Sequence, residues 1–378
     1  MKVMIVVTHL LGTGHLTRAL SLARAFLAGG HTPVVVSGGC AVAHLDTDGI
    51  DLIQLPPVRS DGVNFAQLLD GSDAPVTGHY MQQRQSVLLG QFEKVKPDVL
   101  ITELFPFGRR ILRQEFTTLL QMAQNTAQRP LICASVRDIL APPSKPAKVA
   151  MADALIADFY DAVLVHSDPA VTPLDASWPL SDMLRSKLQY TGYVAQPPTQ
   201  PTPDRIGAGQ IIVSAGGGNV GRSIFETATQ AAALDPDRTW RILIGGSDAA
   251  NLIDQLSKTA SPNTILERAR PEFCQMLLNA AASVSMCGYN TALDILQAGT
   301  PAVFIPFDAG GEVEQSLRAD ALAQLDGICV LRNDALSPAN LLSSVNAMLT
   351  APNRPARQAG IDGARETVRI VAELKGTQ

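Results

Sequence analysis

The first twenty residues, MKVMIVVTHLLGTGHLTRAL (1–20), combine an apolar strand-like run, a glycine-rich turn and the start of a helix. Residues 1–7 are apolar on both faces, which is typical of a strand buried in a parallel sheet. The helical segment after the turn ends at Gly29-Gly30. Its apolar face is predicted to contain Leu16, Ala19, Leu20, Ala23, Phe26 and Leu27. This strand, turn and helix predict a doubly wound α/β fold.

The same alternation continues along the chain. Strands are expected at 1–7, 32–37, 50–55, 97–102, 130–135 and 161–166, and again at 210–215, 240–245, 263–267, 282–287, 301–306 and 327–331. The proline-rich segment YTGYVAQPPTQPTPDRIG (190–207) predicts a linker. We therefore expect two domains, 1–196 and 197–378. The helical tail RETVRIVAELKG could pack back on the first domain.

Composition excludes several classes of protein. Apolar residues make up 46% and charged residues 17% of the 378 residues, as in a packed globular protein. The net charge of −5 gives no overall attraction to nucleic acid. The cysteines lack a CxxC pair, which disfavours a zinc site or a disulfide framework and suggests mostly buried thiols; they are Cys40, Cys133, Cys274, Cys287 and Cys329. Without a signal-peptide pattern or a long apolar run, the chain is expected to be cytoplasmic.

One segment is basic within this acidic chain. Residues 84–148 hold ten Lys or Arg against five Asp or Glu, a net charge of +5. Such a segment could face an anionic acceptor or the inner surface of a membrane, and an ordinary solvated face explains it equally well. Within it, Phe105 and Phe107 lie beside several arginines, a composition suited to a membrane surface, although packing on the sheet explains the phenylalanines better.

The glycine turn of the opening stretch is the first candidate site, because ligands of parallel sheets bind beyond the carboxyl ends of the strands. Gly12, Thr13 and Gly14 would let backbone N–H groups approach a donor phosphate or sugar. They do not make a dinucleotide fingerprint, since Thr17 stands where the third glycine would be. We expect them to line the acceptor side. His15 could accept a proton from an attacking hydroxyl, or could only hydrogen-bond the turn.

A second glycine turn follows the strand expected at 210–215. Gly216, Gly217 and Gly218, with Asn219, precede a helix expected from about Val220. Their N–H groups suit a pyrophosphate held without the lysine of a P-loop, and a tight turn without ligand is the alternative.

A third turn leads into the helix after the strand at 282–287. Gly288, Tyr289, Asn290 and Thr291 can direct N–H groups and a hydroxyl at phosphate oxygens. Asp294 follows three residues later, where a carboxylate can accept both hydroxyls of a ribose.

The next helix supplies polar groups for a sugar. Glu314 and Gln315 begin it, and an acid followed by an amide suits bonding to sugar hydroxyls. Each of these features is ordinary alone, but together, on one half of the chain, they predict a site for a nucleotide-diphosphate sugar.

These residues resemble the GT-B glycosyltransferases of family 28, the MurG-like enzymes, and a bacterial branch of predicted glycosyltransferases most of all. The first domain shares the segments LLGTGHLTRAL, VVVSGG, IQLPPVR, TELFPFGRR, VRDIL, AVLVHSDP and YTGYV. The second shares the glycine loop and GYNTALDILQAGTPAVFIPF. The resemblance implies two Rossmann-like domains facing a cleft, with a UDP-sugar mainly on the C-terminal side and the acceptor on the other.

The resemblance also implies roles for single residues. It places Gly218 and Asn219 in the donor loop, and the segment from Tyr289 to Asp294 on the phosphates and ribose. It further implies that Arg268 and Ala269 contact the base through the backbone, that Glu314 and Gln315 read the donor sugar, and that His15 is the histidine of the N-terminal loop.

Several positions depart from the family pattern. Asp294 is shorter than the usual glutamate, and Arg268 replaces an apolar residue near the base. Glu314 replaces a glutamine, and Ala195-Gln196 stand where an arginine is expected. These departures leave the base and the donor sugar open.

Two carboxylates could assist His15 on the acceptor side. Glu103 and Asp138 both follow strands, and either could orient His15 or deprotonate the acceptor. Either could instead cap a helix or pair with Arg109 or Arg137. We favour Glu103 as the partner.

The predicted function is transfer of a hexose or N-acetylhexosamine from a nucleotide sugar to an acceptor hydroxyl, with His15 as base and neither metal nor cofactor required. Inversion at the anomeric carbon is implied by the resemblance. A UDP-sugar hydrolase or epimerase on the same scaffold is the alternative, and a non-catalytic nucleotide-sugar binder is a third. The sequence identifies neither the acceptor nor an oligomeric state.

Overall fold

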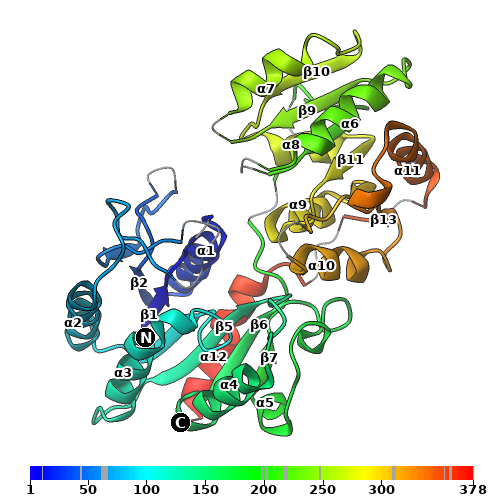
Figure 1. Cartoon of the computed structure of the whole chain (residues 1–378). Coiled ribbons are helices and arrows are strands. Elements are labelled where there is room, and N and C mark those ends of the chain that lie inside the picture. Colours follow the sequence, from blue (N-terminus) through cyan, green and yellow to red (C-terminus); the bar gives the residue numbers. More distant parts are fainter. Residues whose placement is uncertain are drawn as a thin grey trace. The chain divides into compact units, whose positions relative to one another are not determined.

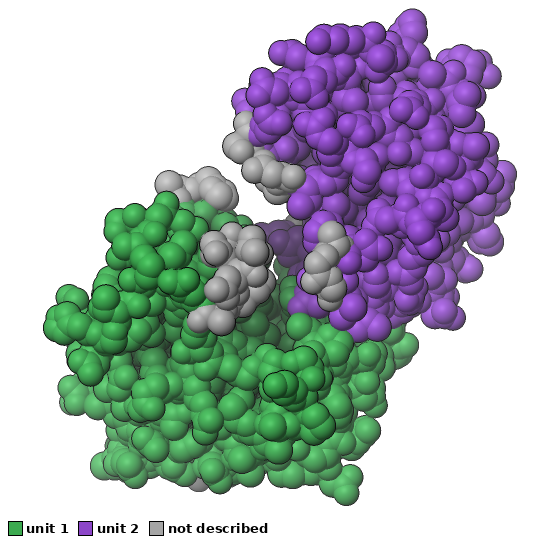
Figure 2. Space-filling model, viewed as in Figure 1, with its two compact units in different colours: residues 1–195, 362–378 green, residues 196–361 purple. Residues whose placement is uncertain are grey.

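The computed structural model describes residues 1–10, 12–42, 45–60, 67–196, 199–200, 203–216, 220–246, 248–308, 312–352, 354–356 and 360–377 (Figure 1). The chain divides into two compact units, each with its own parallel sheet. Unit 1 is Met1–Ala195 with Asp362–Gln378, and unit 2 is Gln196–Ile361 (Figure 2).

Unit 1 has a seven-stranded parallel sheet with the strand order β3-β2-β1-β4-β5-β6-β7. The strands are β1 (Lys2–Val7), β2 (Thr32–Ser37), β3 (Asp51–Gln54), β4 (Val99–Glu103), β5 (Leu131–Arg137), β6 (Ala162–His166) and β7 (Leu188–Tyr190). The first six are the strands predicted from the sequence. The last strand, β7, has only three half-buried residues at the sheet edge, so the sequence has no apolar run there that would predict a strand.

Both faces of this sheet are covered by helices. Val3, Ile5 and Val7 share a core with α1 (Gly14–Ala28) and α12 (Gly363–Gly376). Met4 and Val6 point to the other face, which is covered by α2 (Gly78–Val95), α3 (Arg113–Gln124) and α4 (Pro146–Phe159). The short α5 (Asp182–Lys187) precedes β7. Burial on both faces explains why these strands are apolar throughout.

Unit 2 repeats the arrangement with a six-stranded parallel sheet, in the order β10-β9-β8-β11-β12-β13. Its strands are β8 (Ile211–Ser214), β9 (Trp240–Ile244), β10 (Thr264–Arg268), β11 (Ala282–Ser285), β12 (Ala302–Phe304) and β13 (Ile328–Val330). Its helices are α6 (Arg222–Ala233), α7 (Ala249–Leu256), α8 (Phe273–Asn279), α9 (Tyr289–Ala298), α10 (Glu314–Leu322) and α11 (Pro338–Thr350). All six strands coincide with predicted ones.

The chain leaves unit 1 after Ala195 and returns to it at Asp362. Val194 and Asp362 form an antiparallel bridge, and the N–H of Gly363 donates to the carbonyl of Tyr193 at 2.9 Å. A side chain at Gly363 would come within 2.3 Å of a backbone oxygen, so this crossing requires glycine. The tail 362–378 was assigned to the second domain, with a helix that could pack back on the first; it belongs to unit 1.

Two local expectations need correction. The predicted linker begins too early at residue 190, because Tyr193 and Val194 are buried in unit 1. On α1, Leu27 is 42% exposed, whereas Leu22 is fully buried. Leu27 follows Phe26 by one residue at the end of the helix, and this turns its side chain off the buried face.

Candidate active site

The carboxyl end of the unit 1 sheet brings a histidine and a carboxylate together. His15 lies in the first turn of α1, directly after the loop that follows β1, and Glu103 is the last residue of β4. Because β1 and β4 are neighbours in the sheet, His15 Nδ1 lies 3.0 Å from Glu103 Oε1. The carboxylate can only accept, so Nδ1 carries the hydrogen and Nε2 keeps a lone pair.

The arginine one helical turn after His15 completes this cluster. The Arg18 guanidinium donates to Glu103 Oε1 and pairs with it, and both side chains are almost fully buried. Arg18 Nη2 also lies 3.1 Å from His15 Nδ1, but Nδ1 carries a hydrogen that it donates to Glu103, so it cannot accept one from Arg18. Arg18 was not among the cations predicted to pair with this carboxylate, which were Arg109 and Arg137. The sequence does not reveal the role of Arg18, because this residue occupies a position on the buried face of α1 that an ordinary helix residue could fill.

Burial and charge keep this histidine neutral. Burial, opposed by the contact with Glu103 and aided by the charges of Arg109 and Arg18, lowers the pKa of His15 to about 3. Burial by itself would raise the pKa of Glu103, but Arg18 and His15 hold it well below its usual range. A neutral imidazole beside a carboxylate can accept a proton at Nε2, and the carboxylate then stabilises the imidazolium.

The backbone around His15 is open. A Cβ atom built on Gly12 or Gly14 would meet nothing within 4 Å, and Gly12 has a positive φ of 37°. Thr13 precedes α1 without a side-chain cap. These glycines are therefore not required by packing, which leaves room for a ligand in front of the helix.

Arg84 ties together the loops at the same end of the sheet. It is fully buried, pairs with Glu115 of α3 at 2.8 Å, and donates to the carbonyls of Gly38 and Pro56 and to the Thr8 hydroxyl. These acceptors lie after β2, β3 and β1. Arg84 is therefore a structural clamp and contributes no surface charge to the basic segment 84–148.

The phenylalanines of that segment are also internal. Phe105 stacks on Phe116 with ring centroids 4.6 Å apart, and Phe107 meets the edge of Trp178 at 5.1 Å. Both phenylalanines are buried, which agrees with packing on the sheet and removes them as membrane-surface residues. Asp138 is buried as well, and its Oδ1 accepts from the N–H of Ile139 at 2.7 Å.

In unit 2 the turn between β11 and α9 has the expected form. Gly288 is the N-cap of α9, and Tyr289 begins the helix. A fully buried arginine of α10, Arg318, donates to the carbonyl of Cys287 at 2.9 Å and lies 5.7 Å from the ring centroid of Tyr289. It places a positive charge beside the turn, where an anionic ligand would be favoured. Arg318 was not predicted as a site residue, because it occupies an ordinary position on the buried face of α10.

Asp294 lies one turn further along α9. Burial raises its pKa to about 6, and the thiol of Cys274 on α8 hydrogen-bonds to it. Burial likewise raises the pKa of Cys274 to about 12, so the thiol stays protonated and can donate. Asp294 is thus a carboxylate at neutral pH that loses its charge under mild acid.

The other residues predicted to bind the donor lie at the end of β10 and at the start of α10. Arg268 ends β10 and is exposed, and the N–H of Ala269 donates to the carbonyl of Ile244 at 2.9 Å. A base contact through the Ala269 backbone would therefore use its carbonyl. Glu314 begins α10, and Gln315 accepts at Oε1 from the N–H of Phe307 at 3.2 Å, which turns its amide nitrogen to other partners.

The second glycine turn is described only in part. Gly216 has a φ of +79°, and its N–H donates to Ser214 Oγ at 3.2 Å. Gly217, Gly218 and Asn219 lie outside the described residues. The following helix, α6, begins at Arg222, two residues after the predicted start.

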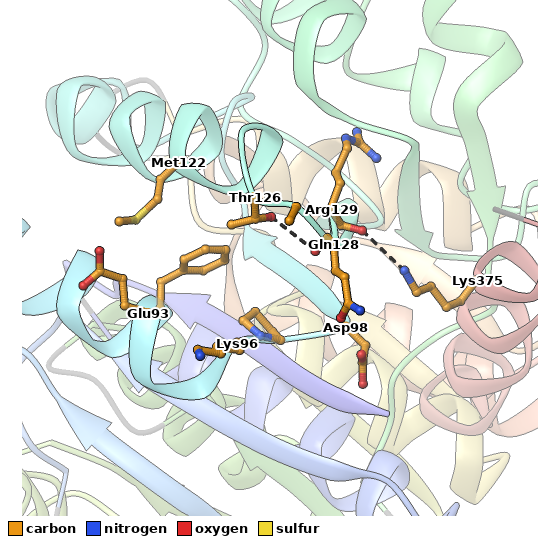
Figure 3. Close-up of a pocket in the computed structure, with 11 residues that line it drawn as sticks. Glu93, Lys96, Asp98, Met122, Thr126, Gln128, Arg129 and Lys375 are labelled. Atoms are coloured by element: carbon orange, nitrogen blue, oxygen red, sulfur yellow. Dashed lines mark hydrogen bonds between the residues drawn. The ribbon is translucent and has the colours of Figure 1, made fainter.

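A separate hollow of about 1150 Å³ lies at the opposite end of the unit 1 sheet. It lies between the end of α2, the end of α3 and α12, and its lining includes Phe92. Figure 3 shows Met122, Lys96, Arg129 and Lys375 around it. Lys375 Nζ donates to the Arg129 carbonyl at 3.4 Å. Asp98 precedes β4 here, whereas Glu103 ends it, so the whole strand separates this hollow from His15.

The described residues offer neither a metal-binding cluster nor a membrane-spanning helix. In that part of the chain no group of three or more His, Cys, Asp or Glu could hold a metal ion, and no helix is long and apolar enough to cross a membrane. All five cysteines are free thiols. Cys133 and Cys287 are buried, but Cys40, Cys274 and Cys329 are only half-buried, fewer buried thiols than expected.

The second half of the chain is similar to a known family of sequences. Residues 211–373 match the glycosyltransferase family 28 C-terminal domain. A Brucella anthropi protein named UDP-N-acetylglucosamine--N-acetylmuramyl-(pentapeptide) pyrophosphoryl-undecaprenol N-acetylglucosamine transferase is 32% identical over 170 residues, 42% of this chain and 44% of its own length. A Gloeobacter violaceus protein of the same name is 27% identical over 171 residues, 43% of this chain and 48% of its own. The match thus spans less than half the length of these curated relatives.

Comparison with solved structures extends over both units. The crystal structure of MurG from Acinetobacter baumannii superposes with a TM-score of 0.63 and 12% identity, covering 99% of this chain and all of the other. Glycosyltransferase VinC, solved in complex with dTDP, gives a TM-score of 0.63 at 14% identity, with both chains fully covered. Both likenesses show the fold, which is the two-domain α/β fold expected from the sequence.

Proposed function

We propose that this chain, a MurG-like protein of the GT-B fold with a glycosyltransferase family 28 C-terminal domain, transfers a sugar from a nucleotide sugar to an acceptor hydroxyl. The donor is a UDP-linked hexose or N-acetylhexosamine bound by unit 2, and unit 1 supplies the group that activates the acceptor. The observation that carries the proposal is the contact of His15 with Glu103 at the carboxyl end of the unit 1 sheet.

His15 is the general base. Its Nδ1 hydrogen is held by Glu103, so Nε2 is available to take the proton of the attacking hydroxyl. A histidine with a pKa near 3 is a weak base in the resting protein. Proton transfer from the acceptor creates an imidazolium beside a buried carboxylate, so Glu103 stabilises the charge that appears in the transition state.

The leaving nucleoside diphosphate is stabilised in unit 2. The N-terminal turn of α9, from Gly288 to Thr291, offers N–H groups, and Arg318 adds a buried positive charge beside it. Asp294 accepts the ribose hydroxyls, and Glu314 with Gln315 contacts the transferred sugar. We propose that these groups suffice without a metal ion or other cofactor, and that direct attack on the anomeric carbon inverts its configuration.

The basic segment supports a further part of the proposal, peripheral contact with the inner face of a membrane. Its exposed cations include Lys94, Lys96, Arg113 and Lys145, and the names of the relatives refer to an undecaprenol-linked substrate. Sedimentation with anionic vesicles at low salt tests this contact. Equal binding to zwitterionic vesicles, or none to either, contradicts it.

The experiment that tests the donor is a thermal-shift screen of nucleotide sugars at one concentration, because a ligand that binds the folded state more tightly raises the melting temperature more. A UDP-sugar should give the largest shift. A larger shift with GDP- or dTDP-sugars would contradict the assignment of uridine. EDTA should leave the shift and the turnover unchanged if no metal ion takes part.

The experiment that tests the reaction uses matched histidine variants. His15 and His79 each occupy the second position of a helix that begins with glycine, but His79 is exposed. His15→Gln should lower kcat by about 100-fold or more, with donor affinity retained, whereas His79→Gln should behave as wild type. Release of free sugar and UDP at an equal rate without acceptor would favour the hydrolase instead.

A further inference from the structure

The contacts of Glu103 continue into the core of unit 1 through a line of polar side chains. Ser135 Oγ lies 2.6 Å from Glu103 Oε2 and 2.9 Å from His166 Nε2. His166 Nδ1 in turn lies 2.8 Å from Thr191 Oγ1. Ser135 and His166 are fully buried, and Thr191 is 2% exposed. Four buried polar groups in a row are costly unless each contact holds one hydrogen.

The sheet places these side chains side by side. Glu103 of β4 is directly paired with Ser135 of β5, His166 ends the neighbouring β6, and Thr191 follows β7. Together with His15, which follows β1, the line crosses the carboxyl ends of β1, β4, β5, β6 and β7 in their order in the sheet. The line is therefore built by strand order and register.

The tautomer of His166 follows from the number of hydrogens available to the contacts in this line. The Ser135 hydroxyl must donate to Glu103, because a carboxylate cannot donate back. Ser135 Oγ then needs a hydrogen from His166, which Nε2–H supplies, and Thr191 donates to Nδ1. The opposite tautomer would leave the fully buried contact of Ser135 with His166 without a hydrogen. The favoured tautomer instead takes the Thr191 hydrogen away from the carbonyls of Gly192, at 2.8 Å, and Val165, at 3.4 Å. The first contact is only partly buried, and the Val165 carbonyl still accepts from the N–H of Thr191 at 3.0 Å.

We propose that His166, protonated at Nε2, acts through Ser135 as a positioning residue that orients Glu103 and thereby fixes His15 as the Nδ1–H tautomer. The proposal deepens the proposed function and rests on His15 as the base. Arg18 and His15 both donate to Oε1 of Glu103 and Ser135 donates to Oε2, so the carboxylate is held in orientation through both oxygens.

The charges around the two histidines support their protonation states. Burial, aided by the charge of Arg18 and opposed by that of Glu103, lowers the pKa of His166 to about 3. His15 faces the same two groups and also Arg109. Both rings are therefore neutral across the working pH range, and their tautomers can be observed without titration.

The first test measures tautomers directly in the full-length wild-type protein labelled with ¹⁵N-histidine. Long-range ¹H–¹⁵N correlation spectra should show His166 protonated at Nε2 and His15 at Nδ1, with His166→Gln and His15→Gln used for assignment. A His166 ring protonated at Nδ1 would overturn the proposal, whatever the enzyme's activity.

The second test removes the link and compares it with a buried serine in the same sheet. Ser37, at the end of β2, is 1% exposed, and its hydroxyl contacts no partner among the described residues. Ser135→Ala should make His15 a mixture of tautomers and lower kcat about tenfold, with the donor KM within about twofold of wild type. Ser37→Ala should leave the tautomers and kcat unchanged, and equal effects of the two variants would refute the inference.

A third comparison asks whether the donor at His166 matters. Gln can present an N–H near the position of Nε2, whereas Leu cannot, so His166→Gln should retain more of kcat than His166→Leu. Equal losses would contradict the proposal. If wild-type protein transfers no sugar but His15 still changes tautomer in Ser135→Ala, the positioning network stands and the proposed function falls.

Discussion

Arg18 provides the sharpest test of how the catalytic cluster is stabilised, because a matched arginine lies on the same helix. Arg18 pairs with Glu103, and both are almost fully buried, whereas Arg24 pairs with Asp46, which is 67% exposed. Replacing one partner of a buried pair leaves the other charge uncompensated, at a cost of about 3–5 kcal/mol. Exposed pairs contribute only about 0–1 kcal/mol.

Arg18→Met should therefore destabilise unit 1 by about 3–5 kcal/mol at pH 7, and Arg24→Met by less than about 1 kcal/mol. Adding Glu103→Gln to Arg18→Met removes the uncompensated carboxylate. The double variant should then recover about 2 kcal/mol of the loss, as a coupling energy between neighbours. Glu103→Gln alone should be about as destabilising as Arg18→Met, because it removes the buried carboxylate that compensates the guanidinium charge.

Urea unfolding followed by tryptophan fluorescence measures these differences. The chain has two tryptophans, Trp178 in unit 1 and Trp240 in unit 2. Replacing Trp240 by Phe in every variant makes Trp178 the sole reporter of unit 1. An Arg18→Met loss no larger than that of Arg24→Met would refute the reasoning, and so would a double variant less stable than both singles.

Three further outcomes follow from the same contacts. His15 stays neutral in the folded state down to about pH 3, whereas the ring in the unfolded chain gains a proton below pH 6.5. Unit 1 should therefore lose stability as the pH falls from 6.5 toward 3. In urea titrations, His15→Gln should reduce this dependence of stability on pH. Gly39→Ala should lower the melting temperature, since a Cβ there would lie 2.3 Å from the His9 carbonyl, whereas Gly90→Ala, with nothing within 4 Å, should not. Asp294→Asn should weaken donor binding by about tenfold. The affinity of the wild-type protein for the donor should fall below pH 6, where the Asp294 carboxylate takes up a proton. Unchanged donor affinity of the variant in calorimetry would exclude the ribose contact.

Local patterns in the sequence were enough to predict the parallel arrangement and every strand except β7, whereas the place of the ligand site stays a prediction. Strands that are apolar on both faces must be covered by helices on both sides, and such sheets bind ligands at the carboxyl ends of their strands. His15 was found in this way, because it directly follows a strand and a glycine turn. The turn at Gly288 and the helix start at Glu314 were found by the same rule.

The partners of these residues could not be predicted in the same way. Arg18 and Arg318 each follow the helical period of a buried face, so nothing local separates them from an ordinary helix position. Their roles depend on Glu103 and Cys287, which are distant in sequence. A buried charge is tolerated only where a partner meets it, and that meeting exists only in the folded chain.

The sequence alone therefore determined which segments form strands and helices, because hydrophobic period and glycine position act over a few neighbouring residues. Only the tertiary structure decided that β1, β4, β5, β6 and β7 lie in this order, with Glu103 in register with Ser135. Strand order sets which polar ends meet, and it depends on the packing of the whole sheet. The line from His15 to Thr191 is the product of that packing.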